Sequence, residues 1–263
     1  MYSFEFEKPS TIADAVAALA AEDAQALGGG QTLIPTLKQR LAAPSKLVSV
    51  SGIPEMQGVC IEDDGSVSIG GATPHAVVAR EAAGSYPALA ALAGQIGDPA
   101  VRNRGTIGGS VANNDPAACY PAGVLGSGAT IVTNTRQIAA DDFFQGMFTT
   151  ALDEGEIITS IRFPVPQAAS YRKFLQPASR FALVGVYLAR FADGVRVAVT
   201  GASEDGVFRW SEAEQALNKE FRPDALMDLR VNPANMIADL HGSKAYRAHL
   251  VSVMTKRAVE DCL

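Results

Sequence analysis

Two glycine-rich segments carry the residue types that most clearly suggest chemistry in this sequence. The first glycine segment (residues 28–35) consists of Gly28, Gly29, Gly30, Gln31, Thr32, Leu33, Ile34 and Pro35. Glycine has no Cβ, so its backbone N–H can approach phosphate oxygens closely and its φ can be positive. A helix that begins within the segment would add a favourable dipole for an anion, and Thr32 would add a hydroxyl donor. These features suit a diphosphate. The alternative is an ordinary tight turn, because the segment matches neither GxGxxG nor GxxxxGK[ST].

The second glycine segment (residues 102–116) again places paired glycines among hydroxyl and amide side chains. Its candidate contacts are Thr106, Ile107, Gly108, Gly109 and Ser110. Two such segments, far apart in the sequence, could close on one ligand from opposite sides. Asp115 could accept a hydrogen bond from a ribose or ribityl hydroxyl, or it could form an N-cap or Asx-turn before Pro116.

The hydrophobic pattern predicts the elements that position these segments. A strand over 24–27 leads into the first glycine segment, and a helix over 33–41 leaves it. The second glycine segment lies within 98–121, a long polar stretch that reads as an irregular loop of functional type. The other predicted elements are helices over 12–20, 73–82 and 85–93, a helical turn over 141–147, and strands over 46–50, 60–62, 66–69, 129–133 and 157–163.

The pattern changes after 164–167, which resembles a linker. Three strands are predicted over 181–191, 195–200 and 207–210, with helices over 212–218 and 244–259. We therefore expect a larger mixed domain over 1–165 and a smaller sheet-and-helix domain over 166–263.

Composition limits the function classes. The 263 residues are 48% hydrophobic and 19% charged, which is typical of a globular protein. The net charge of −6 argues against a nucleic-acid-binding protein. The three cysteines contain no CxxC pair and are fewer than the four thiolates of an iron–sulfur cluster, and the three histidines form no ligand pattern. We therefore expect no metal site in this chain.

The N-terminus has no signal-peptide pattern, and no apolar run is long enough for a transmembrane segment. Together with the sparse cysteines, this favours a reducing cytoplasm.

Longer stretches resemble a known family. The sequence is similar, over nearly its whole length, to the FAD-binding subunits of molybdenum hydroxylases, the xanthine dehydrogenase family. Residues 28–35 and 104–117 resemble the two loops that hold the FAD diphosphate, and 156–164 and 171–186 match in the same order and spacing. The stretches 32–54 and 96–109 are most similar to medium subunits of aerobic, molybdenum-type carbon monoxide dehydrogenases.

The resemblance implies an α+β fold. It implies a two-lobed FAD domain of the p-cresol methylhydroxylase/vanillyl-alcohol oxidase (PCMH/VAO) type over 1–165, with lobes of about 1–55 and 56–165. A carbon monoxide dehydrogenase flavoprotein C-terminal domain, with a three-stranded antiparallel sheet and helices, would follow over 166–263. FAD would bind noncovalently between the lobes and this domain.

The resemblance also implies an electron-transfer role with no catalytic side chain. A small subunit with two [2Fe–2S] clusters would deliver electrons to FAD, which would pass them to an external acceptor. A large subunit with molybdopterin would oxidise the substrate, in a dimer of heterotrimers in the cytoplasm or at the inner face of the membrane. Carbon monoxide is the expected substrate. The alternatives are the flavoprotein subunit of an aldehyde, purine or N-heterocycle dehydrogenase, and a stand-alone flavin oxidase of the same fold.

Individual residues match the family's contacts as follows: Gly28 to Pro35 the first diphosphate loop, Thr106 to Ser110 the second, Asp115 a ribityl contact, Ile158 an apolar contact, Lys173 a basic residue near FAD, Ile96 a neighbour of the cofactor and Phe181 an aromatic beside the flavin. Four positions depart from the family pattern: Ser110 replaces Asn, Cys119 an acid, Leu175 a basic residue and Phe181 a tyrosine. Cys119 is expected to be a packed residue. Phe181 either faces the flavin or packs in the core between the domains.

Most of the remaining polar and aromatic residues of interest are predicted to have structural roles. Trp210 is predicted to lie in the core, and His75 to cap a helix or lie on the surface. His241 and His249 are predicted to lie on the surface or at a subunit interface. Arg102 and Arg104 either form a solvated face or contact a partner or the diphosphate.

Overall fold

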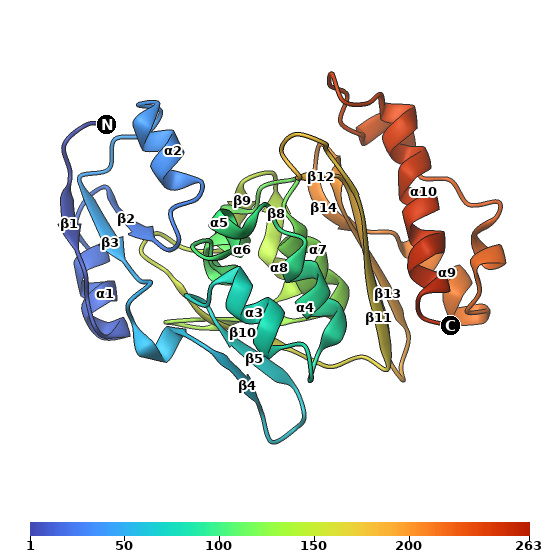
Figure 1. The fold of residues 1–263 in the computed structure, drawn as a ribbon, viewed down its shortest axis with the longest axis horizontal. Coiled ribbons are helices and arrows are strands. Elements are labelled where there is room, and N and C mark those ends of the chain that lie inside the picture. Colours follow the sequence, from blue (N-terminus) through green and yellow to red (C-terminus); the bar gives the residue numbers. More distant parts are fainter.

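The computed structural model describes residues 1–263 as three packed regions that follow one another along the chain (Figure 1). None of the helices combines the length and the apolar character needed to cross a membrane. The predicted α+β class is confirmed.

The N-terminal region is built on a parallel sheet of order β1-β3-β2. Its strands are β1 (Glu5–Glu7), β2 (Ala24–Leu27) and β3 (Lys46–Ser49), with helices α1 (Ile12–Leu19) and α2 (Leu33–Lys38). Thr11 caps α1, since its Oγ1 accepts a hydrogen bond from the Asp14 backbone N–H at 3.1 Å. The first glycine segment begins directly after β2, so the sheet fixes where its backbone emerges.

The middle region is built on an antiparallel sheet of order β4-β5-β10-β6-β7. Its strands are β4 (Val59–Ile61), β5 (Val67–Gly70), β6 (Thr130–Thr133), β7 (Gln137–Ala139) and β10 (Ile158–Phe163), preceded by a 3₁₀ turn, η1 (Pro54–Met56). A short helix, α8 (Ala140–Phe143), and a hairpin of β8 (Phe144–Gly146) and β9 (Thr149–Thr150) follow β7. The strands predicted over 60–62 and 66–69 form β4 and β5, which pair as an antiparallel hairpin, and β10 lies at the centre of the sheet.

Helices cover this sheet where an irregular loop was predicted. Besides α3 (His75–Glu81) and α4 (Pro87–Gly94), the chain forms α5 (Pro99–Arg102), α6 (Ile107–Asn113) and α7 (Cys119–Ser127). The prediction of an irregular loop over 98–121 is wrong. All nine residues of α7 are buried, so it shows no polar face. The glycines of α7 serve helix packing, because a Cβ on Gly126 would lie 2.8 Å from the Tyr187 ring.

The C-terminal sheet has four antiparallel strands, one more than the sequence predicted, in the order β11-β12-β13-β14. The strands are β11 (Ala168–Leu175), β12 (Ala182–Arg190), β13 (Val195–Ser203) and β14 (Gly206–Arg209). The sequence missed β11 because polar and charged residues interrupt its apolar pattern. Tyr171 and Lys173 face α4 and α7, whereas Arg172 pairs with Asp261 at the end of α10.

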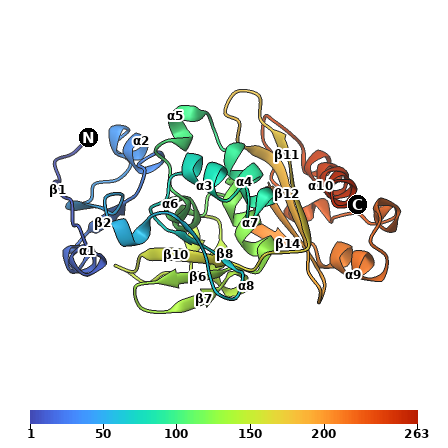
Figure 2. The ribbon, with the colours of Figure 1, turned by 60° about the horizontal axis from the view of Figure 1, so that its bottom comes forward.

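Helices cover both faces of the C-terminal sheet (Figure 2). On the outer face lie α9 (Ser211–Lys219), η2 (Pro223–Leu226), η3 (Pro233–Asn235) and α10 (Lys244–Glu260). Trp210 is buried in the outer core, as predicted, and His241 and His249 are exposed.

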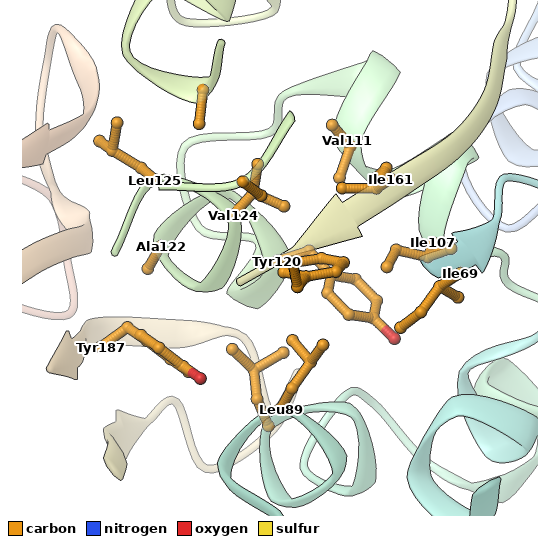
Figure 3. Packing of buried hydrophobic residues seen from close by; sticks show 14 of the residues in the cluster. Ile69, Leu89, Ile107, Val111, Tyr120, Ala122, Val124, Leu125, Ile161 and Tyr187 are labelled. Carbon is orange, nitrogen blue, oxygen red and sulfur yellow. The ribbon is translucent and has the colours of Figure 1, made fainter. Parts of the chain in front are cut away.

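The inner face of this sheet shares one apolar core with the middle region. Tyr171 and Tyr187 belong to the same cluster as Leu89, Ile107 and Tyr120. Figure 3 labels Leu89, Tyr120 and Tyr187 in this packing. Buried apolar contacts therefore hold this sheet against α4 and α7.

A buried arginine joins α10 to the ends of β12 and β13. Arg247 Nη1 donates to the backbone oxygens of Leu183 and Gly201, both at 2.7 Å. Its Nη2 donates to Asp239 Oδ2 at 2.7 Å. These bonds fix the end of the sheet nearest the second glycine segment.

Replacing Arg247 with methionine should lower the free energy of unfolding by about 3 kcal/mol, because two carbonyls and one carboxylate lose their donor. Urea unfolding of the full chain measures this loss. Arg257→Met, on the exposed face of the same helix, is the matched control and should change stability by less than about 0.5 kcal/mol. Equal effects of the two substitutions would contradict the role given to Arg247.

Candidate functional site

A cavity of about 650 Å³ lies where the three regions meet. Its volume is within the range of small-molecule sites. The predicted site residues that line it are Gly28, Gly29, Gly30, Gln31, Thr32, Leu33, Ile96, Thr106, Gly108, Gly109, Ser110, Asp115, Ile158, Lys173 and Phe181. The fold therefore brings together residues from both glycine segments, β10, β11 and the loop before β12.

Three predicted site residues do not line the cavity. Ile107 is fully buried in the core, Pro35 is exposed, and Ile34 packs against Gly30. Successive side chains of a helix point in different directions, so adjacent residues of α2 and α6 cannot all face one cavity.

The first glycine segment presents a row of free backbone donors. None of the N–H groups of residues 28–32 donates a hydrogen bond to another group of the protein, and all five residues line the cavity. Gly30 has φ +72°, a left-handed conformation that glycine adopts without strain. Consecutive unpaired N–H groups on a turning backbone form a concave site for an anion.

In the second glycine segment, the N–H groups at the start of α6 are bonded within the protein and are not free for a diphosphate. The N–H groups of Ile107 and Gly108 donate to the carbonyls of Thr73 and Gly71, at 3.1 and 2.8 Å. The N–H of Gly109 donates to the Thr106 hydroxyl at 3.2 Å. These donors are already satisfied, so this segment supplies a wall rather than a second row of free N–H groups.

The two glycine segments touch each other through their backbones. A Cβ built on Gly29 would lie 1.8 Å from the carbonyl oxygen of Arg104, and one on Gly28 would lie 2.7 Å from Thr106 Oγ1. No side chain fits between these backbones. The contact between the segments therefore requires glycine at positions 28 and 29.

His75 lies beneath the second glycine segment, so the prediction of a surface or capping histidine is wrong. Its backbone N–H donates to the Gly105 carbonyl at 2.9 Å, which draws the start of α3 under this segment. The side chain is only 4% exposed and lines the cavity. Burial, with the positive charge of Arg102, lowers the pKa of His75 to about 4. The turn over residues 70–73, directly after β5, was the sequence feature that could have indicated this position of His75.

The C-terminal sheet positions Asp115. Asp115 Oδ1 accepts a hydrogen bond from the Ala117 N–H at 2.8 Å, which is the Asx-turn alternative, and burial raises the pKa of its carboxyl. The Pro116 carbonyl accepts hydrogen bonds from the Gly201 N–H at 2.7 Å and from the Thr200 hydroxyl at 2.9 Å. Asp115 Oδ2 has no protein partner and remains available to a ligand.

Lys173 of β11 and Phe181, in the loop before β12, line the cavity from the C-terminal region. Lys173 Nζ donates to the Gln95 carbonyl at 2.9 Å and to Cys119 Sγ at 3.4 Å, and Cys119 is a packed residue, as predicted. Phe181 is 46% exposed, so the alternative of core packing between the domains is wrong.

The two arginines of the second glycine segment differ in their surroundings. Arg102 donates to the carbonyls of Ile96 and Gly97, both at 3.0 Å, and so holds Ile96 in the cavity wall. Arg104 is exposed.

A buried carboxylate orders the chain that leads into β10. Glu156 accepts hydrogen bonds from the Thr133 and Thr135 hydroxyls, at 2.6 and 2.8 Å, and from Arg136, at 2.8 and 3.0 Å. The Arg136 guanidinium is the main reason that the pKa of Glu156 falls to about 2, and the hydroxyl donors add to it. This network fixes the approach to Ile158.

The comparisons with known proteins agree with this geometry. A family model described as "FAD binding domain in molybdopterin dehydrogenase" matches residues 2–166. The chain belongs to this family.

Full-length relatives extend the similarity beyond the matched domain. The chain is 34% identical to the carbon monoxide dehydrogenase medium chain of Afipia carboxidovorans, over 98% of this chain and 96% of that one. It is 32% identical to the glyceraldehyde dehydrogenase medium chain of Sulfolobus acidocaldarius, over 98% of each. Among solved structures, carbon monoxide dehydrogenase from Oligotropha carboxidovorans matches with a TM-score of 0.90 at 32% identity, over 99% of this chain and 98% of that one. The chain is therefore a dehydrogenase-type flavoprotein subunit in sequence and fold.

The Glu156 network predicts a defined acid dependence of stability. The carboxyl has its pKa lowered from 4.5 to about 2 by folding, so its stabilisation is complete above pH 4.5 and disappears as the pH falls toward 2. Glu156→Gln should be about 2 kcal/mol less stable than wild type at neutral pH, and this gap should narrow through that window. Urea unfolding across pH measures both. The exposed Glu154→Gln is the control, and a constant gap across pH would refute the assignment.

Proposed function

We propose that the chain binds FAD noncovalently in this cavity and transfers electrons, as the FAD-carrying subunit of a molybdenum hydroxylase. The observation that carries this proposal is the row of five unpaired N–H groups at residues 28–32. A dinucleotide diphosphate is an anion that such a row can bind without any cationic side chain. Family membership supports the same cofactor.

The other cavity residues suit the remaining parts of FAD. Asp115 Oδ2 can accept a ribityl or ribose hydroxyl. Ile96 and Ile158 offer apolar surface to a ring, and Phe181 offers an aromatic face. Lys173 places an ammonium group beside the cavity. Bound FAD would supply the capacity to exchange electrons one or two at a time, while the protein orients it and excludes water.

We propose the domain division 1–165 and 166–263, with lobes of about 1–55 and 56–165 that hold FAD between them and the C-terminal domain. The end of the family match at residue 166 supports this boundary. The separate sheets of the three regions support the lobes.

The proposed partners are a small subunit with [2Fe–2S] clusters, which delivers electrons, and a large subunit with molybdopterin, which oxidises the substrate. An external acceptor receives the electrons from FAD. The proposed assembly is a dimer of heterotrimers, located in the cytoplasm or at the inner face of the membrane. Carbon monoxide is the proposed substrate of the complex, supported by the names of a relative and a structural neighbour. An aldehyde is the second candidate, supported by the glyceraldehyde dehydrogenase medium chain.

The first experiment tests FAD binding. Purified full-length protein should show the visible spectrum of oxidised flavin and release FAD on denaturation. Gly29→Ala should reduce FAD content at least about tenfold, because its Cβ would collide with the Arg104 carbonyl and displace the N–H row. Gly84→Ala, which has open space at the Cβ position, is the control and should retain FAD. Wild-type protein without flavin after incubation with FAD would contradict the proposal.

The second experiment tests Phe181. Because the ring is half exposed at the cavity, Phe181→Ala should lower the free energy of unfolding by less than about 1 kcal/mol, well below the cost of a core cavity. It should weaken FAD retention, and Phe181→Tyr should keep FAD but shift the flavin spectrum or reduction potential. Phe6→Ala, an exposed ring on β1, is the control. Spectra and FAD affinity that are unchanged in both Phe181 variants would remove the residue from the site.

A further inference from the structure

His75 is a buried polar side chain that the functions assigned so far do not use. Its Nδ1 atom is sealed from solvent and has no hydrogen-bond partner. The side chain is 4% exposed, yet it belongs to the cavity lining. Nε2 also makes no hydrogen bond with the protein but is not sealed from solvent, so it is the ring nitrogen that a ligand in the cavity can reach.

The ring is oriented by the second glycine segment. A Cβ on Gly105 would lie 2.6 Å from His75 Nε2 and 3.0 Å from Cδ2, so this edge of the ring faces Gly105. Gly29 approaches the same Gly105 backbone, with its Cβ position 2.6 Å from the Gly105 Cα. Both glycines line the cavity. The Nε2 edge of the ring therefore lies against the Gly105 backbone, which Gly29 of the free N–H row also contacts.

The surroundings keep the imidazole neutral. The Tyr120 ring of α7 lies 5.3 Å away, centroid to centroid, and Arg102 of α5 is the charged group that acts on His75. Burial and this positive charge both disfavour protonation. A neutral imidazole carries a single N–H, and with Nδ1 enclosed by protein, the tautomer protonated on Nε2 directs this hydrogen toward the cavity side.

We propose that His75 is a cofactor-binding residue whose Nε2–H donates a hydrogen bond to an oxygen of the dinucleotide diphosphate. This inference rests on the proposed function, since it assigns one more donor to the same FAD site. The diphosphate is selected over the sugar and rings because the Nε2 edge adjoins the Gly105 backbone, and Gly29 of the N–H row packs against that same backbone. A neutral donor to an anionic oxygen forms a charge-assisted bond.

The test measures affinities of the full chain for FAD, for ADP and for riboflavin by fluorescence and calorimetry. His75→Phe keeps a ring but removes both nitrogens, and it should weaken FAD and ADP by about tenfold or more while riboflavin is unaffected. His75→Gln can place an amide N–H near the Nε2 position and should stay within about threefold of wild type, whereas the shorter His75→Asn should resemble His75→Phe. Tyr120→Phe is the matched control, because its hydroxyl is also buried and unpaired but does not line the cavity.

Each outcome decides between contact and packing. Wild-type affinity for FAD and ADP in His75→Phe would overturn the proposal, and so would equal losses in His75→Gln and His75→Asn. Should His75→Phe fail to fold, the comparison of the Gln and Asn variants still decides. Weakened riboflavin binding with unchanged ADP binding would also overturn the assignment to the diphosphate. Wild-type protein that binds ADP but not FAD would refute the proposed function while leaving the diphosphate contact of His75 supported by the same variants.

Discussion

The structure depends on one backbone-to-backbone contact, in which Gly29 lies against Arg104 and Gly105 with no room for a side chain. This contact joins the N-terminal sheet to the middle region. The N–H groups of residues 28–32 have no protein partners, and all five residues line the cavity. Two needs therefore coincide at the same glycines: close approach of two chain segments, and access of an anion to bare backbone.

The C-terminal region completes the cavity. It contributes few charged groups, and hydrogen bonds fix its position. Thr200 and Gly201 hold the Pro116 carbonyl and thereby set the position of Asp115. Arg247 holds the same end of the sheet from the other side. The sheet shares an apolar core with α4 and α7, so these hydrogen bonds join parts of the protein that already pack against each other. Walls joined in this way suit a ligand held in one orientation, which is what the proposed electron transfer through FAD would require.

The sequence predicted well the features that rest on local patterns. The strand before the first glycine segment, the capped helix α1 and the β4–β5 hairpin follow from periodicity and turn residues. It failed where packing overrides pattern. The helix α7 is buried on every side and rich in small residues, so it resembled a loop, and β11 carries charges because it lies at the sheet edge. The burial of His75 was not predicted because it comes from a long-range pairing with Gly105. Ile34, Pro35 and Ile107 do not line the cavity because neighbouring residues of a helix point in different directions.

The dependence of Asp115 on β12 and β13 has a consequence for biogenesis. Residues up to the end of α6 contribute the N–H row and its facing wall, but the strands that fix Asp115 are translated much later, and Arg247 later still. Because strands translated late fix Asp115, the complete cavity can form only after most of the chain has been synthesised.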